Sequence, residues 1–339
     1  MTIQPCHPPS DRRTAHELIV NLRQRNHPGL ILLTSGSSGQ PKAAVHDVLL
    51  LLEKFQRPRQ VPRTLFDLRF DSISGINILF YMLANGGCGI VAANHSPDAT
   101  AAAIANHRVQ LLPASPTFLT FLLSPKAYTR YDLSSLSLIT YGSEVMPQNT
   151  LQAQLFPNVK FNQSYGMTEI GLLRTKSRAA DSPWFTVKSG EFAVRVVEGL
   201  VEIKTPIAML GYLNAPSPFT EDGWFITGDV AEVDGQWIRV LGRKSEMINV
   251  GGQKVYPAEV EGVIQMMEGV AEVVVKGEPN PLMGHIVTAK VRLTTDETLR
   301  TFRSRLHTAL KGKLEPYKMP RRVTLVNDAL HSARFKKIR

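Results

Sequence analysis

Short apolar runs alternate with helical patterns up to about residue 190, and this alternation leaves few folds open. Residues 87–92, 109–112 and 136–140 are apolar and bounded by turn residues, as buried strands are. Residues 100–107 and 117–123, which lie between those runs, predict helices. Because strands in alternation with helices are typical of layered proteins, we predict an α/β fold.

The pattern changes after Ser189. Residues 191–197 and 200–204 read as two strands, and Glu198 and Gly199 between them read as a turn. This part of the chain is therefore expected to be strand-rich and to close the large α/β unit.

A smaller unit occupies the end of the chain. After a Gly-Gly turn, residues 257–267 predict a helix, and residues 270–276 and 285–293 predict strands. A last helix has arginines on one face and apolar side chains on the other, namely Leu299, Phe302, Leu306 and Leu310. A chain of 339 residues with 43% hydrophobic content can hold roughly two domains of about 150 residues. We predict a large α/β domain at 1–242 and a small α+β domain at 243–339.

The composition favours a cytoplasmic protein without membrane spans. No apolar run approaches the roughly 20 residues that cross a bilayer, and residues 1–13 hold prolines and charges where a secretory signal would be apolar. Cys6 and Cys88 are the only cysteines, so a disulfide framework and a cysteine zinc site are not expected. So few cysteines fit a reducing compartment.

The basic charge is concentrated at the end of the chain. Residues 300–339 hold twelve lysines and arginines against Glu315 and Asp328, which accounts for the whole net charge of +10. Such a tail favours an anionic partner such as a nucleotide, coenzyme A or an acidic carrier protein, although a solvated basic face fits the charge equally well. Aromatic side chains that could stack on bases are sparse there, so nucleic acid is not expected.

Residues 33–42 place hydroxyls, two glycines and a lysine on one short turn, a combination suited to binding polyphosphate. Gly36 and Gly39 let successive backbone N–H groups point at an anion, and Lys42 adds a positive charge. The hydroxyl donors are Thr34, Ser35, Ser37 and Ser38. The apolar residues 29–33 predict a buried strand that holds the loop. The spacing is not that of a Walker A loop, and an ordinary Ser/Gly turn between a strand and a helix remains the alternative.

Further chemical groups follow along the chain, although each alone fits an ordinary structural role equally well. Residues 165–169, Tyr-Gly-Met-Thr-Glu, combine an aromatic ring, a close backbone approach, a hydroxyl and a carboxylate, which suit a base, a phosphate and Mg²⁺. Asp229, at a strand end, could accept both hydroxyls of a ribose. Arg243 places a guanidinium at the boundary of the small unit, and Lys336 and Lys337 add cations near the end of the chain.

Taken in order, these motifs resemble the adenylate-forming superfamily, which includes acyl- and aryl-coenzyme A ligases, carrier-loading adenylation domains and luciferases. The resemblance runs from about Leu30 to Arg339 and includes the phosphate loop, the Y-G-x-T-E motif and a terminal catalytic lysine. It implies an ATP site made of Thr34, Ser35, Gly36, Ser37, Ser38, Gly39, Lys42, Gly142, Ser143, Glu144, Tyr165, Gly166, Asp229 and Arg243.

The resemblance also implies the remaining roles. The acid pocket would be lined by Phe70, Asp71, Ser72, Gly75, Tyr141 and Met167. Catalysis would fall to Lys337, Thr168 and Glu169, with Glu169 holding Mg²⁺. The small domain would be mobile, with its hinge at Ser245 and with Gly251 and Gly252 lining the thiol tunnel.

Two half-reactions follow from this resemblance. A carboxylic acid would attack the α-phosphate of ATP with release of pyrophosphate, while Mg²⁺, the loop donors, Thr168 and Lys337 neutralise the developing charge. A thiol of coenzyme A or of a phosphopantetheine carrier protein would then attack the acyl-AMP. In this family the small domain rotates between the steps, withdrawing the lysine and presenting the glycine pair.

Three positions depart from the family pattern. The phosphate loop begins at residue 34, where relatives have a substantial preceding segment, so we expect a shortened member whose large domain lacks one lobe or takes packing from a neighbour, as in a homo-oligomer. Ser245 stands where the hinge usually has Asp or Lys. Lys336 replaces the glycine before the catalytic lysine, and Lys337 is assigned that role because an isoleucine follows it.

The sequence does not identify the acid. If Asp71 faced the pocket it could pair with the α-amino group of an amino acid, but a solvent-facing or helix-capping aspartate is equally consistent. The basic tail slightly favours a carrier protein and would suit coenzyme A as well. We predict an ATP-dependent acid–thiol ligase for a small aryl or acyl acid. The alternatives are an amino-acid-activating, carrier-loading adenylation protein and a relative that binds nucleotide or a partner without catalysis.

Overall fold

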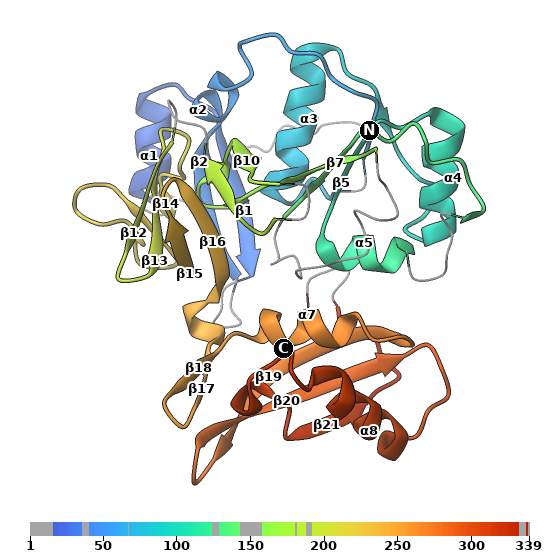
Figure 1. Cartoon of the computed structure of the whole chain (residues 1–339). Helices are drawn as coiled ribbons and strands as arrows, with labels where there is room; N and C mark the ends of the chain where they lie inside the picture. The colour runs from blue at the N-terminus through green and yellow to red at the C-terminus, as the bar shows by residue number, and fades with distance from the viewer. Residues whose placement is uncertain are drawn as a thin grey trace, which may run out of the picture.

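A computed structural model describes the chain at residues 16–35, 41–66, 68–123, 129–142, 158–179, 182–187, 192–331 and 337. The predicted fold class is confirmed: a large α/β domain with a strand-rich end stands above a smaller α+β domain (Figure 1). Among the described helices, none is both long and apolar enough to cross a membrane.

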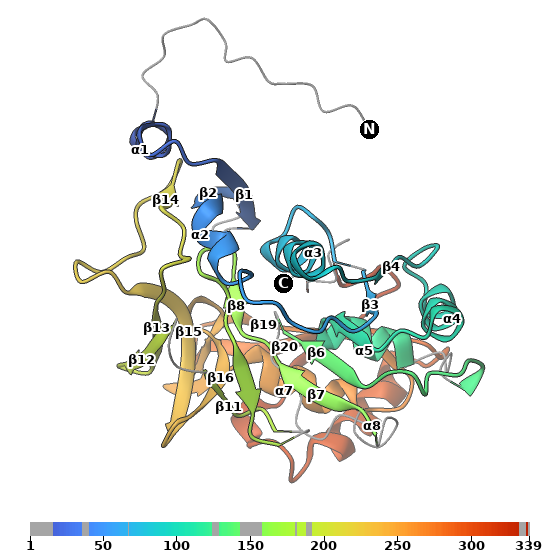
Figure 2. The ribbon, with the colours of Figure 1, turned by 90° about the horizontal axis from the view of Figure 1, so that it is seen from above.

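An antiparallel hairpin carries the predicted phosphate loop between its strands. It consists of β1 (Gly29–Ser35) and β2 (Pro41–Asp47), with β14 (Gly211–Tyr212) on the far side of β2. Helices α1 (Glu17–Gln24) and α2 (Val48–Glu53) flank the hairpin. Seen from above, the hairpin lies to one side of α3 (Ile73–Asn85) (Figure 2).

The prediction that residues 29–33 form a buried strand is wrong in its burial. Leu32 is 4% exposed, but Ile31 and Leu33 are 48% and 56% exposed. The alternation of exposed Ile31 and Leu33 with buried Leu32 shows that only one face of β1 packs against the core, as in a half-buried antiparallel sheet. The alternative of a turn between a strand and a helix also fails, since residues 36–40 connect two strands.

A parallel five-stranded sheet forms the centre of the large domain. Its order is β4-β3-β5-β6-β7, and a core containing Leu112 and Ile139, both fully buried, packs against α4 and α5. The predicted strands are present but shifted, and the run at 87–92 gives only the two residues of β4. The elements are β3 (Thr64–Leu65), β4 (Gly89–Ile90), α4 (Pro97–His107), β5 (Leu111–Ala114), α5 (Pro116–Leu123), β6 (Leu138–Tyr141) and β7 (Lys160–Gln163).

The strand-rich end is a six-stranded sheet of order β10-β11-β16-β15-β13-β12. The hairpin expected around Glu198 and Gly199 is confirmed, and both residues have positive φ, 50° and 78°, as a tight hairpin turn requires. The strands are β10 (Thr175–Ser177), β11 (Phe185–Val187), β12 (Ala193–Val197), β13 (Leu200–Lys204), β15 (Phe225–Asp234) and β16 (Trp237–Arg243). A separate two-stranded pair, β8 (Gly166–Met167) and β9 (Gly171–Leu172), lies beside α3, which contacts β9.

The small domain has its own sheet and core. The sheet order is β18-β17-β20-β19, and β21 adds in parallel to β20. Helix α7 lies between this sheet and the large domain (Figure 1). The elements are β17 (Ile248–Val250), β18 (Gln253–Val255), α7 (Pro257–Gln265), β19 (Val270–Asn280), β20 (Gly284–Leu293), α8 (Leu299–Leu310), η3 (Pro316–Lys318) and β21 (Arg322–Leu325).

The apolar face predicted for the last helix is present in α8 with one correction. Phe302, Leu306 and Leu310 are buried in the core of the small domain, at 0%, 3% and 1% exposure. Leu299 is 40% exposed because it is the first residue of the helix and lies at the edge of the core.

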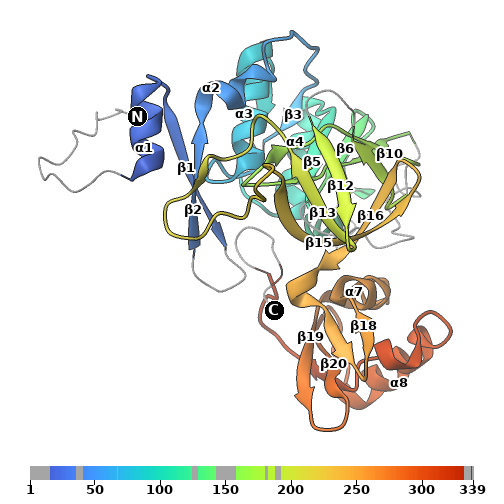
Figure 3. The same ribbon diagram turned by 90° about the vertical axis from the view of Figure 1, so that its left-hand side faces the viewer.

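We propose the domain boundary at residues 242 and 243. Strand β16 ends at Arg243, and the 3₁₀ turn η2 (Lys244–Glu246) follows directly. Beyond η2 the side chains join a core of their own, while the side chains before it belong to cores of the large domain. Figure 3 shows the single passage of the chain from β16 into the small domain.

Replacing Phe302 by alanine should lower the free energy of unfolding by about 3–5 kcal/mol, because a fully buried ring is removed from the small domain's core. Urea unfolding measures this change. Leu299→Ala, on the exposed start of the same helix, is the matched control and should cost less than about 1 kcal/mol. Equal losses for both variants would contradict the core that we describe.

Candidate active site

A cavity of about 1730 Å³ is lined by residues of both domains. It brings together predicted residues that are up to 303 positions apart in sequence, from Thr34 to Lys337. The predicted residues in its lining are Thr34, Lys42, Asp71, Ser72, Gly142, Tyr165, Gly166, Met167, Thr168, Glu169, Asp229, Arg243, Ser245 and Lys337.

Asp229 is held by two partners at the bottom of the predicted nucleotide site. Its Oδ2 accepts a hydrogen bond from Tyr165 Oη at 2.6 Å, and its Oδ1 lies 2.9 Å from Arg243 Nε. Arg243 is directly opposite Asp229 in the β15–β16 pair, so the strand register itself creates the ion pair. Tyr165 is fixed from behind by the ring of Phe185, 5.5 Å away between centroids.

Burial changes the acidity of this group of side chains. Burial raises the pKa of Asp229, while the charge of Arg243 and the hydrogen bond from Tyr165 partly oppose the rise. Burial and then the Asp229 carboxylate raise the pKa of Tyr165 well above its usual value, so Tyr165 stays a hydrogen-bond donor. Each oxygen of the buried carboxylate has one of these partners and keeps a lone pair for a further donor.

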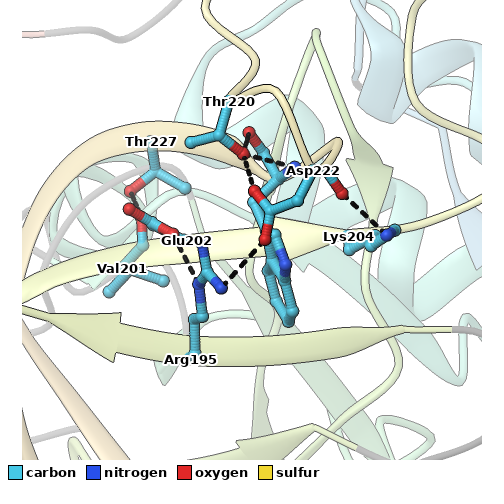
Figure 4. Close-up of polar contacts among 8 residues, drawn as sticks. Arg195, Val201, Glu202, Lys204, Thr220, Asp222 and Thr227 are labelled. Carbon is cyan, nitrogen blue, oxygen red and sulfur yellow. Dashed lines mark hydrogen bonds and ion pairs between the residues drawn. The ribbon is translucent and has the colours of Figure 1, made fainter.

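A polar network fixes the segment that leads to Asp229. Thr227 Oγ1 donates to the carbonyl of Val201 at 2.7 Å (Figure 4). The same oxygen accepts from the N–H of Asp229 at 3.0 Å. On the preceding loop, the Asp222 carboxylate lies 3.3 Å from Arg195, which also binds Glu202 at 2.6 Å. These contacts hold residues 220–227 against strands β12 and β13. The segment that leads to Asp229 is therefore rigidly supported.

The same loop is closed by its own hydrogen bonds. Thr220 Oγ1 donates to Asp222 Oδ1 at 2.6 Å and accepts from the N–H of Trp224 at 2.9 Å. Lys204 Nζ donates to the carbonyl of Asp222 at 2.8 Å, and Arg195 lies 4.3 Å from the Trp224 ring centroid (Figure 4). These exposed contacts position the backbone more than they stabilise the fold.

Glu169 is oriented by a residue that sequence reasoning did not identify. Tyr212 Oη donates to Glu169 Oε1 at 2.6 Å, and the N–H of Met209 donates to the Glu169 carbonyl at 2.7 Å. Burial, followed by the Glu169 carboxylate, raises the pKa of Tyr212. Lys42 Nζ lies 5.2 Å from the Tyr212 ring centroid, so a cation from the phosphate loop and the carboxylate flank one tyrosine.

Lys337 reaches the cavity from the small domain. Its Nζ donates to Oε2 of Glu261 on α7 at 2.8 Å, and both residues line the cavity. Residues 251 and 252, predicted for the thiol tunnel, form the turn between β17 and β18 and lie outside the lining. The structure therefore has the lysine facing the large domain and the glycine pair directed elsewhere.

Only some of the residues predicted for the acid pocket line the cavity. Asp71 and Ser72 line the cavity, but both Asp71 oxygens accept hydrogen bonds from Arg69, at 3.2 and 3.1 Å. Ser72, not Asp71, caps helix α3, since its Oγ accepts from the N–H of Gly75. A Cβ on Gly75 would lie 2.1 Å from the Arg69 carbonyl, so glycine allows the close approach of these segments.

The other predicted residues lie elsewhere. Of the predicted residues that the structure describes, Phe70, Gly75, Tyr141, Gly251 and Gly252 are outside the cavity lining. Phe70 is 55% exposed with its ring 4.8 Å from that of Phe66, and Tyr141 is 2% exposed in the core of the parallel sheet. Several predicted site residues lie outside the described part of the chain, namely Gly36, Ser37, Ser38, Gly39, Ser143, Glu144, Lys336 and the side chain of Ser35.

A buried histidine lies behind the Tyr-Gly-Met-Thr-Glu segment. His46, on β2, is 0% exposed, and neither ring nitrogen has a hydrogen-bond partner among the described residues. Burial lowers the pKa of His46 to about 4, and the nearby backbone of Thr168 opposes this shift. The imidazole is therefore neutral at pH 7 and packs under the chain that presents Thr168 and Glu169.

Sequence motifs alone did not indicate Tyr212, Glu261 or His46. Tyr212 comes to the site through the pairing of β14 with β2, where it is opposite Ala44. Glu261 does fall within the predicted helix at 257–267, and His46 follows the predicted phosphate loop. What was lacking was the knowledge that each side chain points inward.

Comparison with known proteins agrees with this geometry. The model of the AMP-binding enzyme family matches residues 6–201, and that of the AMP-binding enzyme C-terminal domain matches residues 259–337. The chain is 29% identical to the indoleacetate–CoA ligase of Aromatoleum aromaticum over 332 residues, covering 90% of this chain and 65% of the relative. It is 31% identical to the feruloyl-CoA synthase of an Amycolatopsis species over 310 residues, covering 82% and 63%.

Solved structures share the fold. ATP-bound MatB from Rhodopseudomonas palustris has a TM-score of 0.72 and 26% identity, covering 90% of this chain and 65% of that chain. The anthranilate CoA ligase AuaEII in complex with anthranoyl-AMP has a TM-score of 0.76 and 22% identity, covering 91% and 65%. The two-domain architecture is thus that of adenylate-forming proteins.

The chain belongs to the AMP-binding enzyme family, within the adenylate-forming superfamily that the motifs predicted. It spans about 65% of the length of the first curated relative that it matches, in agreement with the prediction of a shortened member.

His46 should make stability depend on pH between about 6.5 and 4. In this window the unfolded imidazole binds a proton that the folded one does not, so the free energy of unfolding falls as the pH falls, by up to about 3 kcal/mol. The variant His46→Gln lacks this titration and should lose less stability on acidification in urea unfolding. His307→Gln, at an exposed site on α8, is the control. An equal loss in wild type and His46→Gln would contradict the buried neutral imidazole.

Proposed function

We propose that this protein is an ATP-dependent acid–thiol ligase. It activates a small carboxylic acid as acyl-AMP with release of pyrophosphate and then transfers the acyl group to a thiol. The observation that carries the proposal is one cavity in which Lys42, Glu169 and Asp229 of the large domain, and Arg243 at the domain boundary, lie together with Lys337 of the small domain. A carboxylate and ATP are both anions, and a site that joins them needs cations on several sides.

Each group has a role that its geometry supports. Asp229, held by Tyr165 and Arg243, accepts the ribose hydroxyls of ATP. Residues 34–42 hold the phosphates, since Thr34 and Lys42 stand at the two ends of the loop and both line the cavity. Lys337 supplies an ammonium ion for the charge that develops on the α-phosphate during attack by the acid. No side-chain nucleophile is needed, because positioning and charge neutralisation carry the reaction.

Glu169 fits a magnesium ion bound together with nucleotide. Mg²⁺ in such sites takes one or two carboxylates and completes its shell with phosphate oxygens and water. Glu169 Oε1 is fixed by Tyr212, and the Thr168 hydroxyl is next to it in the chain. When bound, the metal would neutralise phosphate charge.

The acid is proposed to be an aryl or other apolar carboxylic acid. Relatives are named for indoleacetate, ferulate and long-chain fatty acids. The side of the cavity next to α3 is rich in apolar side chains, which suit such acids, namely Ile73, Ile78, Tyr81, Phe118, Leu172 and Leu173. The amino-acid alternative is weakened because the Asp71 carboxylate is held by Arg69.

The acceptor thiol is proposed to belong to coenzyme A or to a phosphopantetheine carrier protein. The names of the relatives favour coenzyme A. Exposed cations on the small domain suit the phosphates of coenzyme A or an acidic carrier, and they include Arg300, Arg303, Lys311 and Lys313. We also propose that the protein is cytoplasmic and that it forms a homo-oligomer.

Acid-dependent exchange of pyrophosphate into ATP tests the proposal directly. The panel should contain aryl acids, fatty acids and amino acids, with a reaction without acid as the blank. We expect exchange with at least one aryl or fatty acid. Exchange with none of them would leave the non-catalytic alternative, and exchange with amino acids alone would favour the carrier-loading alternative.

The variant Lys337→Ala should lose exchange by roughly 10²- to 10³-fold, the usual effect of removing one preorganised charge from a transition state. Initial rates at saturating ATP and acid measure the loss. Lys290→Ala, at an exposed lysine on β20, is the control and should retain the wild-type exchange rate. If Lys337→Ala keeps the wild-type rate, the catalytic role passes to Lys336 or another cation.

A further inference from the structure

Glu261 is a buried carboxylate that the reaction described above does not use. It lies on α7 and is 2% exposed. Its Oε1 accepts a hydrogen bond from the backbone N–H of Val275 at 2.9 Å, and its Oε2 accepts from Lys337 Nζ at 2.8 Å. One oxygen therefore anchors the carboxylate to the sheet of the small domain, and the other binds the lysine.

The contact with Lys337 is stronger than a surface ion pair. The side chains are 3% and 19% exposed, so solvent screens the attraction only partly. A buried carboxylate without a cation is costly, which favours a lysine rotamer that reaches Glu261. Because Val275 fixes the carboxylate, the ammonium group is held at one point on the cavity wall.

A second carboxylate fixes the chain near Lys337. Glu272 Oε2 accepts from the N–H of Leu330 at 2.6 Å and lies 2.9 Å from His331 Nδ1, and Arg292 binds the other oxygen. His331 in turn forms an antiparallel bridge with Lys337. Burial by itself raises the pKa of Glu272, but the bonds from Arg292, His331 and Leu330 hold the pKa below its usual value. Glu272 thus anchors the backbone at residues 330 and 331, which bridges to Lys337. The direction of the Lys337 side chain is then set by its contact with Glu261.

We infer that Glu261 is a positioning residue for Lys337. It holds the ammonium group toward the large domain before ATP and the acid bind, so that little of the freedom of a four-carbon side chain has to be lost in the transition state. Both residues belong to the small domain, so the pair stays together when that domain rotates. This inference rests on the proposed function, in which Lys337 acts in the first half-reaction.

The variant Glu261→Gln tests it because glutamine keeps the size and an acceptor for Val275 while removing the charge. We expect the kcat of pyrophosphate exchange to fall about tenfold, as for loss of one hydrogen bond to a charged group, with the KM for ATP little changed. Thioester formation from supplied acyl-AMP should keep its rate, because Lys337 is withdrawn in that step. In the Lys337→Ala background the same substitution should cause no further loss.

The control is Glu259→Gln on the same helix. Glu259 also pairs with a lysine, Lys318 at 2.6 Å, but its side chain is 42% exposed, and the variant should exchange at the wild-type rate. An unchanged or faster exchange in Glu261→Gln overturns the inference. So does an equal loss in both half-reactions, or the same loss in the Lys337→Ala background, since those results indicate a structural role. If Glu261→Gln does not fold, Glu261→Asp, which keeps the charge but withdraws it by one methylene, should show the same separation of half-reactions.

Chemical labelling of lysines gives a readout that does not need activity. If no acid supports pyrophosphate exchange by the wild-type protein, the proposed function fails. The contact of Glu261 with Lys337 can still be measured then, by reaction of the lysines with an amine-specific ester followed by mass spectrometry. We expect Lys337 to label several-fold faster in Glu261→Gln, with the labelling of Lys318 unchanged. Equal labelling of Lys337 in wild type and variant would show that Glu261 does not hold it.

Discussion

The ion pair between Asp229 and Arg243 joins the nucleotide site to the connection between the domains. The two residues face each other across the β15–β16 pair, and Arg243 is the last residue of β16 before the 3₁₀ turn that begins the small domain. A nucleotide that binds Asp229 must therefore interact with the same guanidinium that marks the boundary. Under the proposed function, the ribose site therefore lies directly beside the residue that leads into the small domain.

The two domains contribute different functional side chains to the cavity around this pair. The large domain contributes the carboxylates Asp229 and Glu169 together with the tyrosines that orient them, Tyr165 and Tyr212. The small domain contributes Lys337, held by a carboxylate of its own. Arg243 ends β16 beside Asp229 on β15, and Lys337 pairs with Glu261 within the small domain, so neither ion pair depends on how the chain beyond η2 is placed.

Much of the site could be predicted from local sequence, because its residues occur in short motifs whose order is specific. Asp229, Arg243 and residues 165–169 were assigned in this way, and the structure places all of them in one cavity. Contacts that depend on distant pairing could not be assigned. Tyr212 contacts Glu169 across 43 positions because β14 pairs with β2, and nothing in the local pattern at residue 212 indicates this.

Prediction of burial was weaker than prediction of strands. Residues 29–33 are apolar throughout and do form a strand, but an apolar run does not show whether one face or both will be covered. Likewise, the pocket residues around Phe70 were predicted from their position in the chain. Phe70 lies before α3 and is 55% exposed, while α3 itself places Asn77 and Ile78 in the cavity lining.

The exposed edge of β1 has a consequence for how the phosphate loop behaves. Strand β2 is held by β14 and by its buried residues 44–47, whereas β1 pairs with β2 alone in the described structure and has more exposed side chains. Segments with few buried contacts open with less free energy than the core around them. The strands beside residues 36–40 should therefore exchange their amide hydrogens sooner than the parallel sheet does, and bound triphosphate would slow this exchange by linking both strands.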